Sequence, residues 1–209
     1  KTAQELAKER LARIEAAINL EEPDRVPYSG VGGDVIPAYA GVTHHEYCYD
    51  YDKTREALKK FHRDFPCDWS FASGFTGVGV PPVTFAFADY PDVNAVFAMY
   101  GTVHDLLGDV CTRYPGREIE ENCSPQFVGG KFMEAEEYDE LIEDPIGFMA
   151  ETILPRICKN LQTTTKAMAT WVRLGLEYRN VAAFMEGVNK DLEELGYPIM
   201  PITMGMVPL

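Results

Sequence analysis

Groups that could carry chemistry are concentrated in one short stretch of the chain, THHEYCYDYD at positions 43–52. The stretch offers imidazole, thiol and carboxylate side chains, which bind metal ions and also transfer protons. The neighbours His44 and His45 do not share a face of a helix or of a strand, so a metal site that used both would need an irregular loop. Three interpretations stay open: metal binding, contact with a substrate, and a solvated loop with a helix cap. For both histidines our site hypothesis is contact with a substrate.

Two glycine-rich segments are the other candidates for a binding site. Residues with strand propensity run into SGVGGD at 29–34 and into ASGFTG at 72–77. Glycines at the end of a strand allow the backbone to turn sharply or to approach a ligand closely. The polar and aromatic side chains in or beside these segments include Tyr28, Asp34, Ser73 and Phe75. We predict that these four side chains line one substrate pocket, and a packing role is the alternative for each.

The elements that must position these residues alternate between helix and strand. Apolar residues recur every three or four positions in residues 2–20 and around residues 52–60, which predicts two amphipathic helices, the second capped by Asp52. Their expected buried faces are Ala7, Leu11, Ile14 and Ile18 in the first helix, and Ala57, Leu58, Phe61 and Phe65 in the second. Strands are predicted at 26–31 and from Cys67 onward. Two strands separated by a helix favour a parallel sheet and an α/β fold.

The rest of the chain divides into an irregular middle and a helical part. Five prolines and short β-prone runs at 81–133 predict hairpins and loops inserted between regular elements. A short acidic helix is expected at 134–142, and two or three helices are expected in 146–195, the last ended by Gly196. Residues 202–207 carry no charge and predict a strand that is buried on both faces.

Composition excludes several classes of function. With 33 acidic against 19 basic residues the formal charge is −14, so the surface would repel a nucleic-acid backbone. No apolar run approaches the roughly 20 residues that cross a membrane, and no signal peptide opens the chain, which favours the cytoplasm. Five scattered cysteines without a CxxC argue against a disulfide framework and against a zinc site of cysteines alone. The isolated residues His62 and His104 are expected at the surface or in helix caps.

Four segments resemble the uroporphyrinogen decarboxylase superfamily, in the order in which that family carries them. RIEAAINLEEPDRVPYSG is similar to its N-terminal helix and the turn into barrel strand one, KKFHRDFPCDWSFASG to the next helix and strand two, YDELIEDP to the helix after the insertion, and MPITMGMVPL to strand three. The resemblance implies that residues 1–209 are the N-terminal portion of a (β/α)8 TIM barrel, with a β-rich insertion at 81–133 between strands two and three. The alternative is a complete, smaller α/β domain.

The resemblance leaves two activities and one non-catalytic role. Decarboxylases of this superfamily pair the substrate carboxylates with an Arg-rich segment after strand one, whereas here no Arg or Lys lies between Arg25 and Lys53. Ser73 and Gly74 also stand where those enzymes carry an Asp. We therefore favour the methyltransferase branch, enzymes of one-carbon metabolism that move a methyl group between a small methylated donor, a corrinoid and an acceptor. A decarboxylase acting on a porphyrin precursor, or a barrel relative that binds a metabolite or a corrinoid protein, are the alternatives.

The methyltransferase branch implies zinc and a corrinoid as cofactors. Its zinc ligands, a His and two Cys, lie on later strands, so the resemblance assigns no metal ligand within residues 1–209. The implied partners are the C-terminal half of the same barrel, a small-molecule substrate and a corrinoid protein.

Overall fold

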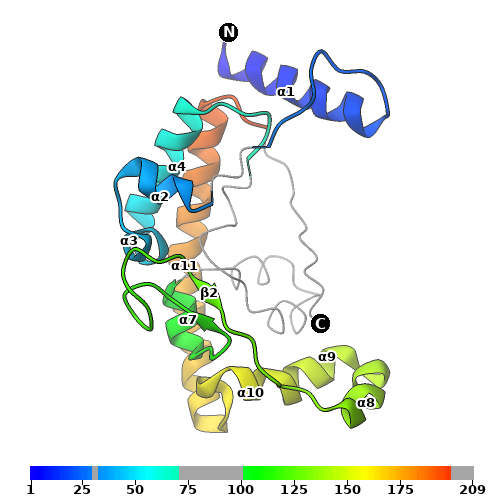
Figure 1. The fold of residues 1–209 in the computed structure, drawn as a ribbon, viewed down its shortest axis with the longest axis vertical. Helices are drawn as coiled ribbons and strands as arrows, with labels where there is room; N and C mark the ends of the chain where they lie inside the picture. The colour runs from blue at the N-terminus through cyan, green and yellow to red at the C-terminus, as the bar shows by residue number, and fades with distance from the viewer. Residues whose placement is uncertain (30–32, 71–100, 199–209) are drawn as a thin grey trace. The chain divides into compact units, whose positions relative to one another are not determined.

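The computed structural model describes three ranges of the chain: residues 1–29, 33–70 and 101–198. They group into two compact units, the first drawn from 1–70 and 183–198 and the second from 101–182 (Figure 1). The long helix α11 (Thr164–Glu194) begins in the second unit and ends in the first. The strand predicted at 202–207 lies outside the described residues.

Capping explains where the helices of the first unit begin. They are α1 (Ala3–Ile18), α2 (Val35–Ala40), α3 (His44–Tyr49) and α4 (Tyr51–Asp64). Helices α1 and α3 each start with a capping box, in which Thr2 or Thr43 accepts a backbone N–H three residues on and a glutamate bonds back. Asp50 caps α4 by accepting the N–H of Lys53 at 3.0 Å. The predicted cap at Asp52 is therefore wrong, because the helix starts earlier.

Helix α1 buries arginines where the spacing predicted an apolar stripe. Arg10, Arg13 and Ile14 are buried, whereas Leu11 and Ile18 are exposed. The helix is as long as predicted, but its buried face is turned. Arginines can occupy this face because each guanidinium has carbonyl or carboxylate partners that offset the cost of desolvation.

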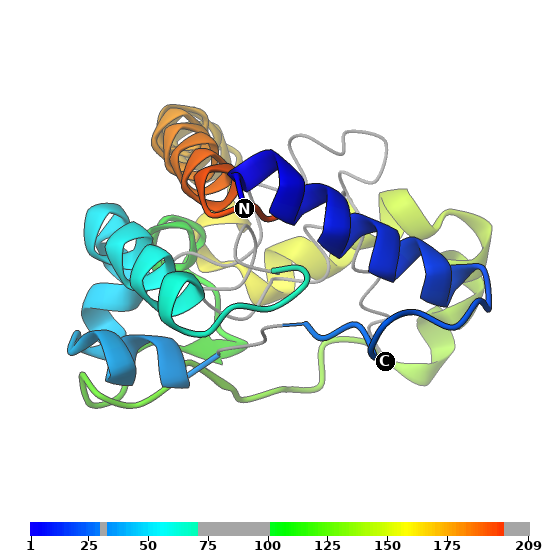
Figure 2. The ribbon, with the colours of Figure 1, turned by 90° about the horizontal axis from the view of Figure 1, so that it is seen from above.

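The end of α11 packs against α1. Gly196 follows the helix with φ of +75°, the left-handed conformation expected of a residue that ends a helix. A Cβ atom at this position would lie 2.6 Å from the Cβ of Leu6, so the close approach also requires glycine. Arg10 donates to the Gly196 carbonyl oxygen at 2.5 Å and lies 4.1 Å from the centroid of the Tyr197 ring. Figure 2 shows the red end of α11 beside the N-terminal part of α1.

Helix α4 buries most of the predicted face. Ala57, Leu58 and Phe61 are buried as expected. Phe65 is 46% exposed, which corrects the prediction. It stands at the C-cap, where the helix has ended, and its ring packs against that of Tyr39 with centroids 4.8 Å apart.

One parallel β-bridge joins Ser29 and Trp69, within the two segments predicted as neighbouring strands. Beside it, the N–H of Asp68 donates to the carbonyl oxygen of Tyr28 at 2.8 Å. The two segments therefore run parallel at this point, but residues 26–28, predicted as part of the first strand, are not in a strand. The residues that follow in both predicted strands lie outside the described ranges.

The second unit combines a small hairpin with short helices. Its elements before α11 are α7 (Gly101–Leu107), β1 (Thr112–Arg113), β2 (Gln126–Phe127), η1 (Ala135–Glu137), α8 (Tyr138–Glu143), α9 (Pro145–Phe148), the π-helical turn η2 (Met149–Ile153), α10 (Leu154–Ile157) and η3 (Lys159–Leu161). Strands β1 and β2 pair antiparallel, with Thr112 opposite Phe127, and residues 114–125 connect them. Helix α7 was not predicted there. The acidic helix expected at 134–142 is confirmed as η1 and α8.

Candidate functional site

A buried carboxylate organises the start of the first predicted strand. The side chain of Asp68 is fully buried. It accepts from Arg13 at 2.5 Å, from two nitrogens of Arg25 at 2.6 and 2.7 Å, and from the N–H of Tyr28 at 2.8 Å. Arg13 in turn holds Asp24 through two hydrogen bonds of 2.5 and 2.6 Å. We call these five residues the Asp68 network.

The charged groups of the Asp68 network are paired with one another. Burial raises the pKa of Asp68, but the hydrogen bonds from Arg25, Tyr28 and Arg13 lower that pKa more, so it lies below its usual value. Arg13 lowers the pKa of Asp24 to about 2. The paired carboxylates raise the pKa of Arg13. These groups stay charged at neutral pH and are already engaged with one another, so the network fixes the backbone rather than offering a reactive group.

The structure brings together two of the predicted site residues, Asp34 and His44. The Nε2 atom of His44 lies 3.6 Å from a carboxylate oxygen of Asp34, too long for a hydrogen bond. The Asp34 side chain is 70% exposed, whereas that of His44 is only 15% exposed. Within the described ranges, the buried Nε2 atom has no hydrogen-bond partner. We call these two residues the open pair: an exposed carboxylate beside a buried imidazole nitrogen, with no hydrogen bond between them.

The other predicted site residues lie apart from this pair or outside the described ranges. Because 44–49 is helical, His45 leaves α3 on a different side from His44, and its ring contacts Tyr49 at 4.6 Å between centroids. Tyr28 is 56% exposed and enters the Asp68 network only through its backbone. Ser73 and Phe75 lie outside the described residues, so the predicted pocket that joins them to Asp34 stays a prediction.

The thiol closest in sequence to the open pair is inert. Cys48 stands one turn after His44 in α3 and is buried. Burial, and then the nearby charge of Asp34, raise the pKa of its thiol to about 12, so it is protonated at neutral pH and is a poor nucleophile or metal ligand. Within the described ranges, no three His, Cys, Asp or Glu side chains group closely enough to hold a metal ion. The described residues therefore do not fit the zinc that the resemblance implies, and no zinc ligand is assigned among them.

The prediction that His62 is a surface or capping residue is wrong, because its side chain is buried against Tyr197. Its Nδ1 atom lies 2.9 Å from the carbonyl oxygen of Leu58, and its Nε2 atom lies 2.5 Å from the hydroxyl of Ser70. The carbonyl can only accept, so Nδ1 carries the proton and Nε2 accepts from Ser70. Burial lowers the pKa of His62, which keeps it neutral. Its spacing of four residues from Leu58, on the predicted inner face of α4, was the signal that could have placed it.

His104, in the second unit, is also buried, which corrects the same prediction. Its two ring nitrogens lie 3.2 Å from Asp109 and 3.5 Å from Glu118, and its ring stacks on Tyr114 with centroids 4.5 Å apart. Burial lowers its pKa, but Asp109 and then Glu118 raise that pKa more, so it lies above its usual value. The chain between these residues shows no hydrophobic periodicity that would have revealed the contact.

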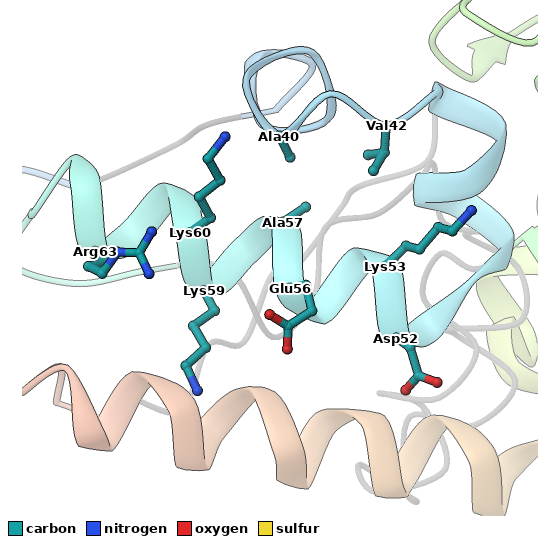
Figure 3. A pocket seen from close by; sticks show the side chains of 9 residues that line it. All are labelled: Ala40, Val42, Asp52, Lys53, Glu56, Ala57, Lys59, Lys60 and Arg63. Carbon is teal, nitrogen blue, oxygen red and sulfur yellow. The ribbon is translucent and has the colours of Figure 1, made fainter.

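A groove of about 470 Å³ runs along α4 in the first unit (Figure 3). Apolar side chains at 40, 42 and 57 and charged side chains of α4 line it. Of its lining residues, Asp52 belongs to the stretch 43–52 that the sequence singled out for chemistry, and the others lie outside the candidate segments. The signal that could have found it is the density of Lys and Arg in 53–63, within a chain of formal charge −14.

No family model matches the chain, no curated protein matches it, and no solved structure matches it. Among the described residues, no helix is long and apolar enough to cross a membrane.

Proposed function

We propose that the chain is part of a methyltransferase of the uroporphyrinogen decarboxylase superfamily, with a (β/α)8 barrel whose first two strands contain the bridge between Ser29 and Trp69. The enzyme would move a methyl group between a small methylated donor, a corrinoid and an acceptor. The corrinoid, and the zinc of such enzymes, would be held by parts of the barrel or by a corrinoid protein outside the described residues.

The Asp68 network supports the assignment because it joins the motifs that carry the resemblance. Arg13 comes from RIEAAINL, Asp24 and Arg25 come from PDRVP, and Asp68 comes from CDWS. These segments are separated in the sequence but meet through one buried carboxylate. In a barrel, such a network would hold the first helix and the first two parallel strands together.

The observation that carries the choice of activity is the engagement of Arg25. Both of its terminal nitrogens donate to Asp68, and no Arg or Lys follows until Lys53. A porphyrinogen decarboxylase must pair several substrate carboxylates with cations near strand one, and a guanidinium already held in a bidentate pair does not serve that purpose. A small methyl donor without carboxylate groups has no such requirement. This favours methyl transfer over decarboxylation.

We place the donor contact at the open pair of Asp34 and His44. When a methoxyl or methylamine donor loses its methyl group, the oxygen or nitrogen left behind must be stabilised or protonated. An imidazole nitrogen beside a carboxylate can provide a hydrogen bond or a proton at that atom. Asp34 would contribute its exposed carboxylate as a second polar group at the same contact.

The test uses the protein produced from its full coding sequence. It is incubated with reduced cobalamin and, separately, with methanol, methylamines and methoxylated aromatic compounds, while methylcobalamin is followed by its visible spectrum. A parallel reaction contains uroporphyrinogen, with products separated by chromatography. The proposal expects methyl transfer from at least one donor and no decarboxylation. Decarboxylation at a useful rate, or no methyl transfer from any donor with or without a corrinoid protein, would overturn it.

A further inference from the structure

The groove along α4 has the size and lining of a small-molecule site. Its volume of about 470 Å³ falls within the range of roughly 300 to 1,000 Å³ that ligand pockets occupy. All of its lining residues belong to the first unit. The groove is separate from the open pair of Asp34 and His44, neither of which lines it.

Helical spacing explains the shape of the groove. Lys53, Ala57 and Lys60 stand at positions i, i+4 and i+7 of α4 and so share one face. At 1.5 Å per residue, the two lysine Cα atoms are about 10 Å apart along the helix axis. The small side chain of Ala57 leaves a hollow between them, and Ala40 and Val42 form the facing wall. Figure 3 shows Lys53 and Lys60 extending from α4 on the side of that wall.

One end of the groove carries the available positive charge. In the described part of the chain, no carboxylate oxygen lies within 4.0 Å of the Lys60 ammonium, which instead donates to the Tyr39 carbonyl oxygen at 2.9 Å and lies 4.4 Å from the centroid of the Tyr39 ring. Arg63, one turn further on, meets Asp64 through its Nε atom at 3.1 Å. Both Lys60 and Arg63 therefore keep donors that can turn toward a ligand.

The remaining lysines of the groove are already neutralised. Lys53 forms an ion pair with Glu46 at 2.5 Å, and Lys59 forms one with the buried carboxylate of Asp191 at 2.9 Å. These pairs raise the pKa of both lysines. The groove is therefore asymmetric, with a cationic end at Lys60 and an apolar middle. Asp52 and Glu56 also line it, and their carboxylates point away from the wall of Ala40 and Val42 (Figure 3).

We propose that this groove binds a small amphipathic anion, with its oxyanion head on Lys60 and Arg63 and a short apolar tail along Val42 and Ala57. The head is a carboxylate or a phosphate monoester, because both offer acceptor oxygens to an ammonium and a guanidinium. The acidic surface elsewhere repels anions, so binding depends on this local cationic end. The site is independent of the proposed methyl transfer.

Isothermal titration calorimetry with four probes tests the proposal: hexanoate, hexyl phosphate, acetate and inorganic phosphate. A hexyl probe should bind at least about tenfold more tightly than the matching probe without a tail, because the apolar middle accommodates methylene groups. Tighter binding of hexanoate would identify a carboxylate ligand, and tighter binding of hexyl phosphate a phosphate ester. Equal binding with and without the tail, or no binding, would overturn the proposal.

Three variants locate the site. Lys60→Gln should lower the affinity for the better hexyl probe about tenfold, the loss expected for one charge-assisted hydrogen bond. Val42→Trp fills the groove without changing charge and should abolish binding. Lys8→Gln removes an exposed lysine of α1 and is the matched control for net charge. An equal loss in the Lys8 and Lys60 variants would mean general attraction to positive charge and would contradict a built site.

Discussion

Asp68 and Asp34 are two aspartates of the first unit, placed beside the two predicted strands, and they differ in burial and in hydrogen bonding. Asp68 is fully buried and accepts hydrogen bonds from two arginines and a backbone N–H. Asp34 is 70% exposed and faces a single imidazole at 3.6 Å. The first carboxylate has its charge balanced inside the protein, whereas the second is exposed beside a buried nitrogen of His44 that has no hydrogen-bond partner among the described residues.

The comparison indicates that the carboxylate of Asp68 stabilises the fold, whereas we propose that the carboxylate of Asp34 contacts the substrate. A buried carboxylate without partners is very costly, so Asp68 and its arginines depend on one another. An exposed carboxylate loses little when its neighbour changes. We therefore expect substitutions around Asp68 to change stability and substitutions around Asp34 to change activity.

The largest effect is expected for Asp68→Ala. It leaves the buried guanidinium of Arg13 with only the exposed carboxylates of Asp24 and Glu9, and breaking a buried pair typically costs about 3 to 5 kcal/mol. Urea denaturation measures the free energy of unfolding. Asp34→Ala is the matched control and should change it by less than about 0.5 kcal/mol. Equal losses in the two variants would remove the distinction between the two aspartates.

The difference in unfolding free energy between wild type and Asp68→Ala should depend on pH, in a direction that follows from the pKa of Asp68. The pKa of Asp68 is lower in the folded protein than the value of about 3.9 expected when unfolded. Its contribution is therefore fully present above the unfolded pKa and is lost as pH falls through the folded pKa. The gap in unfolding free energy between wild type and Asp68→Ala should narrow as the pH is lowered below about 4. A gap that stays constant down to pH 2 would show that the carboxylate charge does not matter.

Arg25→Gln should have a smaller effect than Asp68→Ala. The Arg25 side chain is half exposed, so water can replace part of what it donates, and we expect a loss of about 1 kcal/mol. Thermal unfolding followed by circular dichroism detects such a change. A loss as large as that of Asp68→Ala would mean that Arg25, rather than the buried carboxylate, is the centre of the network.

His104, in the second unit, should contribute to stability with the opposite pH dependence from Asp68. Its pKa is higher in the folded protein than the unfolded value of about 6.5, so its contribution is fully present below pH 6.5 and is lost as pH rises through the folded pKa. His104→Gln should therefore destabilise most at about pH 5 and least at pH 9, in urea unfolding at both values. Greater destabilisation at high pH would contradict the contacts with Asp109 and Glu118.

The sequence predicted the elements of the first unit better than the roles of its charges. Apolar periodicity located α4 and its inner face, and glycine chemistry located the end of α11 at Gly196. Hydrophobic periodicity considers only apolar residues. It therefore predicted that α1 buries Leu11 and Ile18, and it missed the buried arginines. Their burial depends on carboxylates distant in the sequence, and no local pattern contains that information.

For the same reason, the sequence predicted only part of the candidate site. The spacing of residue types brought out Asp34 and His44, and the structure places them together. The same reasoning grouped His45 and Tyr28 with them, because it could not know that α3 is a capped helix or that Tyr28 takes part through its backbone. The pairing of His62 with Ser70 required knowledge of how α4 packs on the following segment.

The rate of methyl transfer in Asp34→Asn, measured with unfolding free energy on the same preparation, tests the central claim most directly. The substitution keeps the shape of the side chain and removes the charge beside His44. We predict a rate at least about tenfold below wild type, the effect of losing one charged interaction at the reacting group, with stability changed by less than about 0.5 kcal/mol. A wild-type rate would contradict the claim that the open pair acts on the donor.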